Sequence, residues 1–221
     1  MAASLNQLSQ EMAGVVADVR RSLVQVTIGV GQGAGTLWHA DGLIVTNAHV
    51  IGGVAAGRPR PMSGQITQGE VMVTLPDGSQ RAARVLAHDP DRDLAALHID
   101  ARDLATIPMG DSHRVKAGQW VFAIGHPWGV RGAASAGVVI GSGAEWPEMP
   151  EGSREWVITS LRVRPGNSGG PLVDVRGRLI GINTLMTGPQ AGAAVPVQTI
   201  RDFLTEALGS RVVQSASPAY L

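Results

Sequence analysis

The sequence predicts an all-β protein in which two groups of about six strands follow one another, with a helix near each end. Glycine makes up 29 of the 221 residues, as expected for a chain with many tight turns. Short runs rich in Val, Ile and Thr alternate apolar and polar positions, which is typical of half-buried strands. Apolar spacing of the helical kind occurs only near the two ends.

The first half of the chain begins with helical spacing over residues 5–21, and residues 1–21 are assigned to an N-terminal helical segment. The first strand group covers about 22–110. Its strands are predicted at residues 23–30, 36–38, 43–46, 71–75, 82–87 and 94–99. Pro76-Asp77-Gly78 is a strong turn signal between two of them.

The second strand group covers about 115–200, and both groups belong to one predicted domain over residues 22–208. Its strands are predicted at residues 120–124, 137–141, 156–160, 171–174, 179–183 and 193–197. A closing helix is expected over 197–208, with Gly209 as its stop signal and a flexible tail over 209–221. Residues 52–69 and 142–155 are predicted to be long mobile loops.

Composition excludes several classes of function. The 18 basic and 18 acidic residues cancel, so no nucleic-acid partner is expected. Cysteine is absent, and the six histidines form no helical metal-binding pair, so neither a metal nor an organic cofactor is predicted. No stretch has the pattern of a membrane span or a signal peptide. The printed chain is expected to be soluble, and both a cytoplasmic and an exported location stay open.

The clearest chemical signal is Gly166-Asn167-Ser168-Gly169-Gly170. A serine among glycines suits a nucleophile, because the backbone can turn tightly and let a substrate carbonyl approach main-chain N–H groups. The N–H groups of Gly166 and Ser168 are therefore predicted to form an oxyanion hole.

A nucleophilic serine needs a base, and the base needs a carboxylate to orient it. His49 follows the apolar run 43–45, which places it at a strand end. Asp93 directly precedes another apolar strand, whereas Asp89 and Asp91 lie further into the turn. We therefore predict His49, Asp93 and Ser168 as a catalytic triad divided between the two strand groups.

These residues lie in TNAHV, DPDRDLA and GNSGGPL, which together resemble the catalytic blocks of HtrA/Deg (protease Do) serine proteases. Three further stretches also resemble this family, namely GQGAGTLW, AIGHPWG and LIGINT. The resemblance extends over about residues 22–208. The His, Asp, Ser order is also that of chymotrypsin-like enzymes. The resemblance implies a chymotrypsin/trypsin-like double six-stranded β-barrel and a serine endopeptidase of bacterial protein quality control. Its substrates would be unfolded or misfolded polypeptides.

The sequence departs from the family pattern in two places. Family members usually carry one or two PDZ domains after the protease, whereas this sequence stops about a dozen residues past the expected closing helix, so either a protease-only member or an excised domain is expected. Before the nucleophile, Arg162 and Arg164 replace small or neutral residues. A pocket made by Leu161, Val163, Ile182 and Asn183 would favour small or medium aliphatic residues before the cut. An inward arginine would favour Glu or Asp instead, but both are expected to face solvent or loop carboxylates such as Glu145 or Glu155.

Assembly and function each keep an alternative. The family resemblance implies a homotrimer with contacts from residues 5–19, and the alternative is a helix packed on its own barrel. The alternative function is a protease-like fold that acts mainly as a chaperone or protein-binding module. Because all three triad residues are present, catalysis is favoured.

Overall fold

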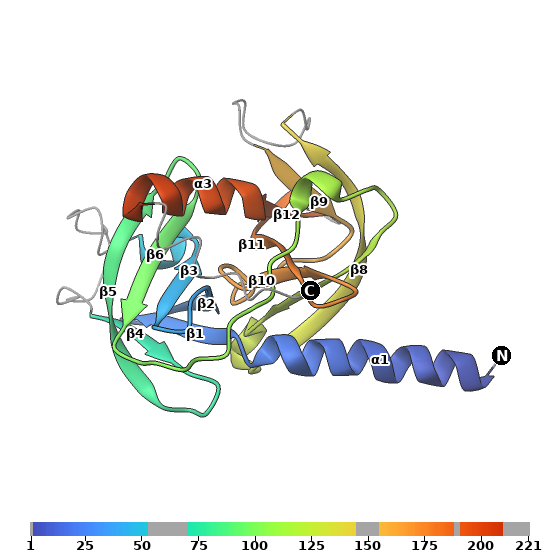
Figure 1. Cartoon of the computed structure of the whole chain (residues 1–221), viewed down its shortest axis with the longest axis horizontal. Helices are drawn as coiled ribbons and strands as arrows, with labels where there is room; N and C mark the ends of the chain where they lie inside the picture. Colours follow the sequence, from blue (N-terminus) through green and yellow to red (C-terminus); the bar gives the residue numbers. More distant parts are fainter. Residues whose placement is uncertain (1, 53–69, 145–154, 188–190, 210–221) are drawn as a thin grey trace.

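The structure is a computed structural model that describes residues 2–52, 70–144, 155–187 and 191–209. Two closed antiparallel barrels of six strands each stand side by side (Figure 1). The strand order is β1-β2-β3-β6-β5-β4 in the first barrel and β10-β11-β12-β9-β8-β7 in the second. The predicted all-β double barrel is therefore confirmed.

The first barrel is built from six strands that follow the alternating apolar runs closely. They are β1 Leu23–Ile28, β2 Gly31–Leu37, β3 Leu43–Thr46, β4 Val71–Thr74, β5 Gln80–Asp89 and β6 Leu94–Ile99. Gly78, with a φ of 87°, turns the chain between β4 and β5, which is a conformation that favours glycine. The predicted turn at Pro76-Asp77-Gly78 thus joins two paired strands.

The second barrel repeats this arrangement with longer strands. They are β7 Trp120–Gly125, β8 Ala133–Gly143, β9 Trp156–Thr159, β10 Pro171–Asp174, β11 Leu179–Thr187 and β12 Ala191–Pro196. Gly177, with a φ of 72°, lies in the hairpin between β10 and β11. The predicted loops 52–69 and 142–155 and the tail 209–221 fall largely outside the described residues.

β2 is longer than the sequence predicted, because its glycine-rich start was not predicted as a strand. A Cβ on Gly33 would lie 2.7 Å from Val50 and 3.3 Å from the carbonyl oxygen of Ser168. A Cβ on Gly35 would lie 2.9 Å from Ile44. These glycines therefore permit close packing within a strand, which is a property of the tertiary structure.

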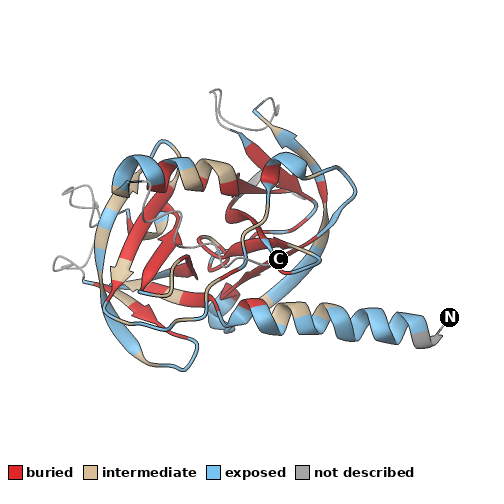
Figure 2. Ribbon diagram, viewed as in Figure 1, coloured by how far each residue is buried: buried red, intermediate tan, exposed pale blue. Residues whose placement is uncertain are grey.

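Apolar side chains fill each barrel and the space between the barrels (Figure 2). The largest cluster joins residues of both barrels and of the closing helix α3 (Val197–Leu208), and it includes Trp38, Phe122 and Phe203. α3 contacts β5 and β6 of the first barrel and β11 and β12 of the second. Arg92 of the first barrel also donates to Glu206 of α3 at 2.6 Å. The helix therefore bridges the two barrels.

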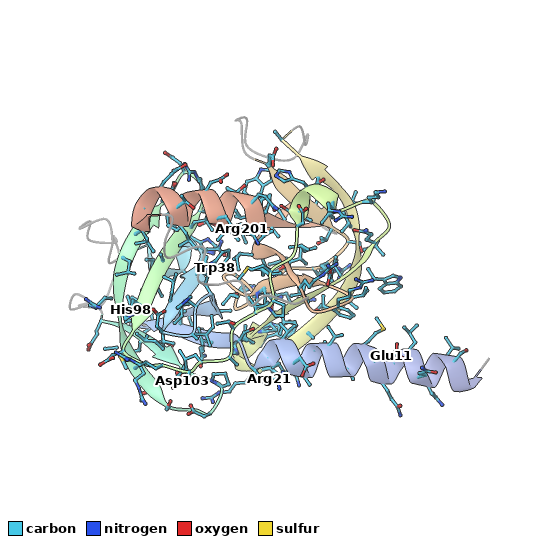
Figure 3. All side chains as sticks on the ribbon, viewed as in Figure 1. Glu11, Arg21, Trp38, His98, Asp103 and Arg201 are labelled. Atoms are coloured by element: carbon cyan, nitrogen blue, oxygen red, sulfur yellow. The ribbon has the colours of Figure 1, made fainter. Side chains whose placement is uncertain are left out.

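The N-terminal helix α1 (Ala2–Arg20) leads away from the barrels (Figure 1). Figure 3 shows Glu11 on the projecting part and Arg21 where the helix meets the barrels. Val19 is buried, whereas Leu5 and Leu8 are 66% and 52% exposed. α1 has 19 residues, and it packs on its own protein mainly through its C-terminal half. Whether copies of this chain form a trimer stays a prediction.

Candidate active site

His49 lies just beyond the end of a fully buried strand. β3 ends at Thr46, and the short helix α2 (Ala48–Ile51) begins after Asn47. Ala48 and Ile51 are buried, so they anchor the helix, while the side chain of His49 is half exposed. The imidazole is thus presented at the surface on a rigid base.

Asp93 accepts hydrogen bonds from three groups. Its carboxylate oxygens lie 3.0 and 2.9 Å from Nδ1 of His49, and the His49 backbone N–H donates to Oδ1 at 3.0 Å. The hydroxyl of Thr184 donates to Oδ2. Asn47 donates to the Asp93 carbonyl at 2.9 Å and so fixes the backbone. This carboxylate orients the imidazole and selects the tautomer with the proton on Nδ1.

The ionisation of Asp93 reflects two opposing effects. Burial of the side chain, which is 13% exposed, raises the pKa. Hydrogen bonds from His49 and Thr184 favour the charged form and outweigh burial, so the pKa of Asp93 lies below its ordinary value. The carboxylate is therefore ionised at neutral pH.

Ser168 lies in the loop between β9 and β10, which is braced by the first barrel. Ala34 of β2 donates to the Ser168 carbonyl at 2.8 Å, and Thr36 donates to the Gly169 carbonyl at 3.2 Å. Gly169 has a φ of 84°, and any Cβ there would collide with the Ala34 carbonyl. The loop therefore reaches the first barrel only because glycine follows the serine.

The Ser168 hydroxyl donates to the carbonyl of Thr184 at 2.8 Å. Over the described residues, no hydrogen bond joins it directly to His49. Thr184 nevertheless contacts both residues, because its backbone carbonyl accepts from Ser168 while its side-chain hydroxyl donates to Asp93, which in turn pairs with His49. The structure thus brings the three predicted residues into one network that crosses from the second barrel to the first.

Thr184 is the member of this network that sequence reasoning missed. The pairing of β11 with β12 shifts register between Asn183 and Leu185, so Thr184 lies in a β-bulge. A bulge turns one side chain away from the regular alternation, which here directs the hydroxyl toward Asp93. Nothing in the local sequence LIGINT marks the bulge, so no signal in the chain alone pointed to this threonine.

The backbone before Ser168 forms a tight turn. Asn167 N–H donates to the Arg164 carbonyl at 2.8 Å, and Gly166 has a φ of 97°. Proline followed by a residue with positive φ is the pattern of a type II turn. The N–H groups of Gly166 and Ser168 have no hydrogen-bond partner among the described residues, so both are available to one acceptor.

The segment that follows β7 contacts this turn through a backbone hydrogen bond. His126 N–H donates to the Gly166 carbonyl at 2.8 Å, and a Cβ on Gly166 would collide with the His126 carbonyl. Glycine is thus required at position 166 both by its φ and by this contact. His126, which the sequence placed near the expected cleft, contacts the turn through its backbone.

Comparison with known proteins agrees with this geometry. Residues 33–182 match the model of the family described as the trypsin-like peptidase domain. The chain belongs to the trypsin-like peptidase family. It is 32% identical to a putative serine protease HhoB of Synechocystis over 78% of the chain, and 37% identical to the mitochondrial serine protease HTRA2 of Bos taurus over 79%.

A solved HtrA-type protease, AlgW with a tripeptide, superimposes on this trypsin-like peptidase with a TM-score of 0.74 and 26% identity. The match covers 91% of this chain and 64% of AlgW. The predicted resemblance to HtrA/Deg proteases is therefore confirmed. The chain spans 39% of the length of HhoB and 36% of that of HTRA2.

The four residues predicted to line a substrate pocket are all buried in this trypsin-like peptidase, with exposed fractions of 6% or less. Leu161 packs in the apolar cluster inside the second barrel, and Ile182 packs in the cluster between the barrels. The amide of Asn183 donates to the carbonyls of Gly170 and Pro171. Val163 is packed near Gly192, where an added Cβ would lie 2.6 Å from Cγ2 of Val163. Their role in binding substrate stays a prediction.

Arg162 and Arg164 are exposed, whereas Leu161 and Val163, which alternate with them, are buried, in agreement with the predicted alternation. Arg164 does not pair with a loop carboxylate of the described residues. Its guanidinium lies over the ring of Trp128, 4.6 Å from the centroid. An exposed aromatic partner is thus found for this side chain, for which solvent or a loop carboxylate was expected, while Glu145 falls outside the described residues.

The described residues contain no group of three or more His, Asp or Glu side chains placed to hold a metal ion. Within the same ranges, no helix combines the length and the hydrophobicity needed to cross a membrane.

Proposed function

We propose that this trypsin-like peptidase is a serine endopeptidase, with Ser168 as nucleophile, His49 as general base and Asp93 as the residue that orients His49. The observation that carries the proposal is the pairing of the Asp93 carboxylate with Nδ1 of His49, with Thr184 in hydrogen-bond contact with both Asp93 and Ser168. An ionised carboxylate against Nδ1 leaves Nε2 of His49 free to accept a proton, which is what a serine nucleophile requires.

In the first step, Ser168 Oγ attacks the carbonyl carbon of the scissile bond while Nε2 of His49 takes the hydroxyl proton. The negative charge that develops on the carbonyl oxygen would be bound by the N–H groups of Gly166 and Ser168. His49 then gives the proton to the leaving amine, and the C–N bond breaks. Water adds to the acyl-enzyme in the same manner, and Ser168 is regenerated.

The hydroxyl of Ser168 must turn away from the Thr184 carbonyl before this reaction. A main-chain N–H of a bound polypeptide is a suitable donor to replace it at that carbonyl. We therefore infer that substrate binding releases the hydroxyl for His49, so that the nucleophile becomes active when an extended peptide lies beside β11. In the turn at residues 164–167, which we call the oxyanion turn, the N–H of Gly166 already lacks a hydrogen-bond partner among the described residues, as does the N–H of Ser168 that follows it.

The proposed substrates are unfolded or misfolded polypeptides, cleaved after small or medium aliphatic residues. Support comes from Val163, an apolar side chain that directly precedes the oxyanion turn, and from the exposure of both neighbouring arginines. A buried unpaired Lys or Arg of the substrate would be costly in apolar surroundings.

We expect mass-spectrometric profiling of a digested denatured protein mixture to give Val, Ala, Ile and Leu before the cut. A dominant preference for Glu or Asp would contradict this specificity.

The central test uses a fluorophosphonate probe together with casein digestion. Ser168 should be the labelled residue by peptide mapping, and Ser168→Ala should abolish both labelling and digestion. His49→Ala should suppress labelling as well. Ser135→Ala, which changes an exposed serine of β8, serves as the matched control and should keep both activities. Label on another serine, or labelling that persists at full rate without His49, would favour the alternative of a protein-binding module.

A further inference from the structure

A pocket of about 160 Å³ lies where the end of α1 meets both barrels. We call it the helix-base pocket. It is lined by side chains from α1, from β1, from the end of β4 and from the segment after β7. Its polar lining residues are Arg20, Gln25, Thr74, His126 and Arg131.

The charge of the helix-base pocket is positive and not balanced. No carboxylate lines it, and neither Arg20 nor Arg131 forms a salt bridge within the described part of the chain. The nearby acidic side chains are engaged elsewhere, because Asp18 pairs with Arg21 and Asp77 accepts from the Ser79 N–H. An anion that entered the pocket would therefore meet two guanidinium groups without competing carboxylates.

His126 adds a buried polar group to the pocket wall. It is 5% exposed, and its Nδ1 accepts from the Gly132 N–H at 3.3 Å, so the neutral ring carries its proton on Nε2. Nε2 has no hydrogen-bond partner among the described residues. Burial lowers the pKa of His126, the nearby Val24 carbonyl opposes this lowering, and the charge of Arg131 adds to it. The wall thus contains a donor without a partner, in a positive field.

We propose that the helix-base pocket binds a small oxyanion, that is, a phosphate or carboxylate group. Arg20 and Arg131 would hold the oxygens by charge-assisted hydrogen bonds, and the side chains of Gln25 and Thr74 offer further donors. Such a ligand supplies the negative charge that the lining lacks.

Hydrogen bonds link the pocket to the proposed oxyanion hole. Arg20 donates to the Gly132 carbonyl at 2.6 Å, Gly132 donates to the ring of His126, and His126 N–H donates to the Gly166 carbonyl. A ligand that orders this segment would therefore stabilise the turn that carries the Gly166 N–H. This effect on the oxyanion hole rests on the proposed protease function, whereas binding of the ligand in the helix-base pocket does not.

The experiment titrates the full chain with inorganic phosphate at constant ionic strength, and NMR follows the ring of His126 and the amide of Gly132. We expect a saturable change at both positions and an upward displacement of the His126 pKa, because a bound anion favours the protonated ring. Arg20→Gln and Arg131→Gln should each weaken binding about tenfold or more. Arg81→Gln, which changes an exposed arginine on β5, is the matched control and should leave the affinity unchanged.

Acetate, titrated in the same way, distinguishes a carboxylate ligand from a phosphate ligand. The ion that saturates the pocket at the lower concentration identifies which of the two groups the pocket binds. Changes that follow ionic strength alone, or that persist when Arg20 and Arg131 are both replaced, would overturn the site. Fluorophosphonate labelling of Ser168 should become about fivefold faster with the pocket filled. Binding with no effect on labelling would overturn the coupling, while an absence of labelling at any ion concentration would instead contradict the protease function.

Discussion

Asp93 is one of three non-glycine residues that the structure describes with a positive φ, here 53°. Aspartate tolerates this left-handed conformation better than most side chains, and its backbone is held by Asn47. The conformation turns the carboxylate toward the His49 ring instead of into the strand that follows. At the scale of single residues, this local strain is compensated by the hydrogen bonds that the carboxylate accepts.

Asp93→Asn should lower kcat about ten-thousand-fold while the fold is retained, because the amide no longer selects the His49 tautomer with a free Nε2. Steady-state kinetics with a peptide substrate, beside circular dichroism, would measure the effect. Asp91→Asn in the same turn is the control, and its kcat should match that of the parent chain. Equal losses in both variants would show that the turn, and not the Asp93 carboxylate, matters.

The free energy of unfolding should fall as the pH is lowered from about 7, and His126 should contribute first. The pKa of His126 is lowered in the folded state, so below about pH 6.5 the unfolded chain binds a proton that the buried ring does not. Asp93 contributes in the same direction below about pH 4, since its folded-state pKa is also lowered. We expect the free energy of unfolding, measured with urea between pH 7 and 5, to depend less steeply on pH in His126→Gln than in the parent chain. Identical slopes would exclude this account of His126.

Among the elements of the fold, the oxyanion turn and the segment after β7 are held together by direct contacts. The turn at residues 164–167 contacts the segment at residues 126–129 through the Gly166 carbonyl and through the stack of Arg164 on Trp128. Trp128 has a φ of 55° and is 72% exposed, so the ring is not needed for the core. Where the family pattern has a small or neutral residue, this chain has Arg164, and its guanidinium lies over the Trp128 ring.

Trp128→Ala should lower kcat/KM by about two- to fivefold, which corresponds to the loss of one exposed cation–π contact. We expect the loss mainly in kcat and in the rate of fluorophosphonate labelling, because the turn positions the oxyanion and not the substrate. Trp128→Phe should restore part of the activity. Trp120→Ala, which removes another exposed tryptophan on β7, should have no such effect. A loss confined to KM would assign Trp128 to substrate binding instead.

At the scale of the whole molecule, the first barrel supplies His49 and Asp93 and the second supplies Ser168 and Thr184, and α3 holds the two barrels together. α1 leads away from this centre (Figure 1). Asn167, beside the proposed nucleophile Ser168, is 3% exposed and neutral, so it offers no buried charge for an N-terminal ammonium group.

An N-terminal extension should therefore leave peptidase activity within a few-fold of the parent chain. The measurement compares peptide hydrolysis by chains with and without a folded tag before Met1. A strict requirement for a free N-terminus would contradict it, and in that case Asn167→Asp should change the dependence.

Local patterns in the sequence predicted the strand periodicity, the division into two barrels and the choice of His49, Asp93 and Ser168 as the proposed triad, because alternation and glycine-rich turns are local properties of the chain. Tertiary structure decided the rest. The β-bulge that brings Thr184 to Asp93 depends on pairing between β11 and β12, and the strand at Gly31–Leu37 depends on close packing against Val50 and Ser168. The stack of Arg164 on Trp128 joins loops 36 positions apart, and such contacts are fixed only when both barrels have folded.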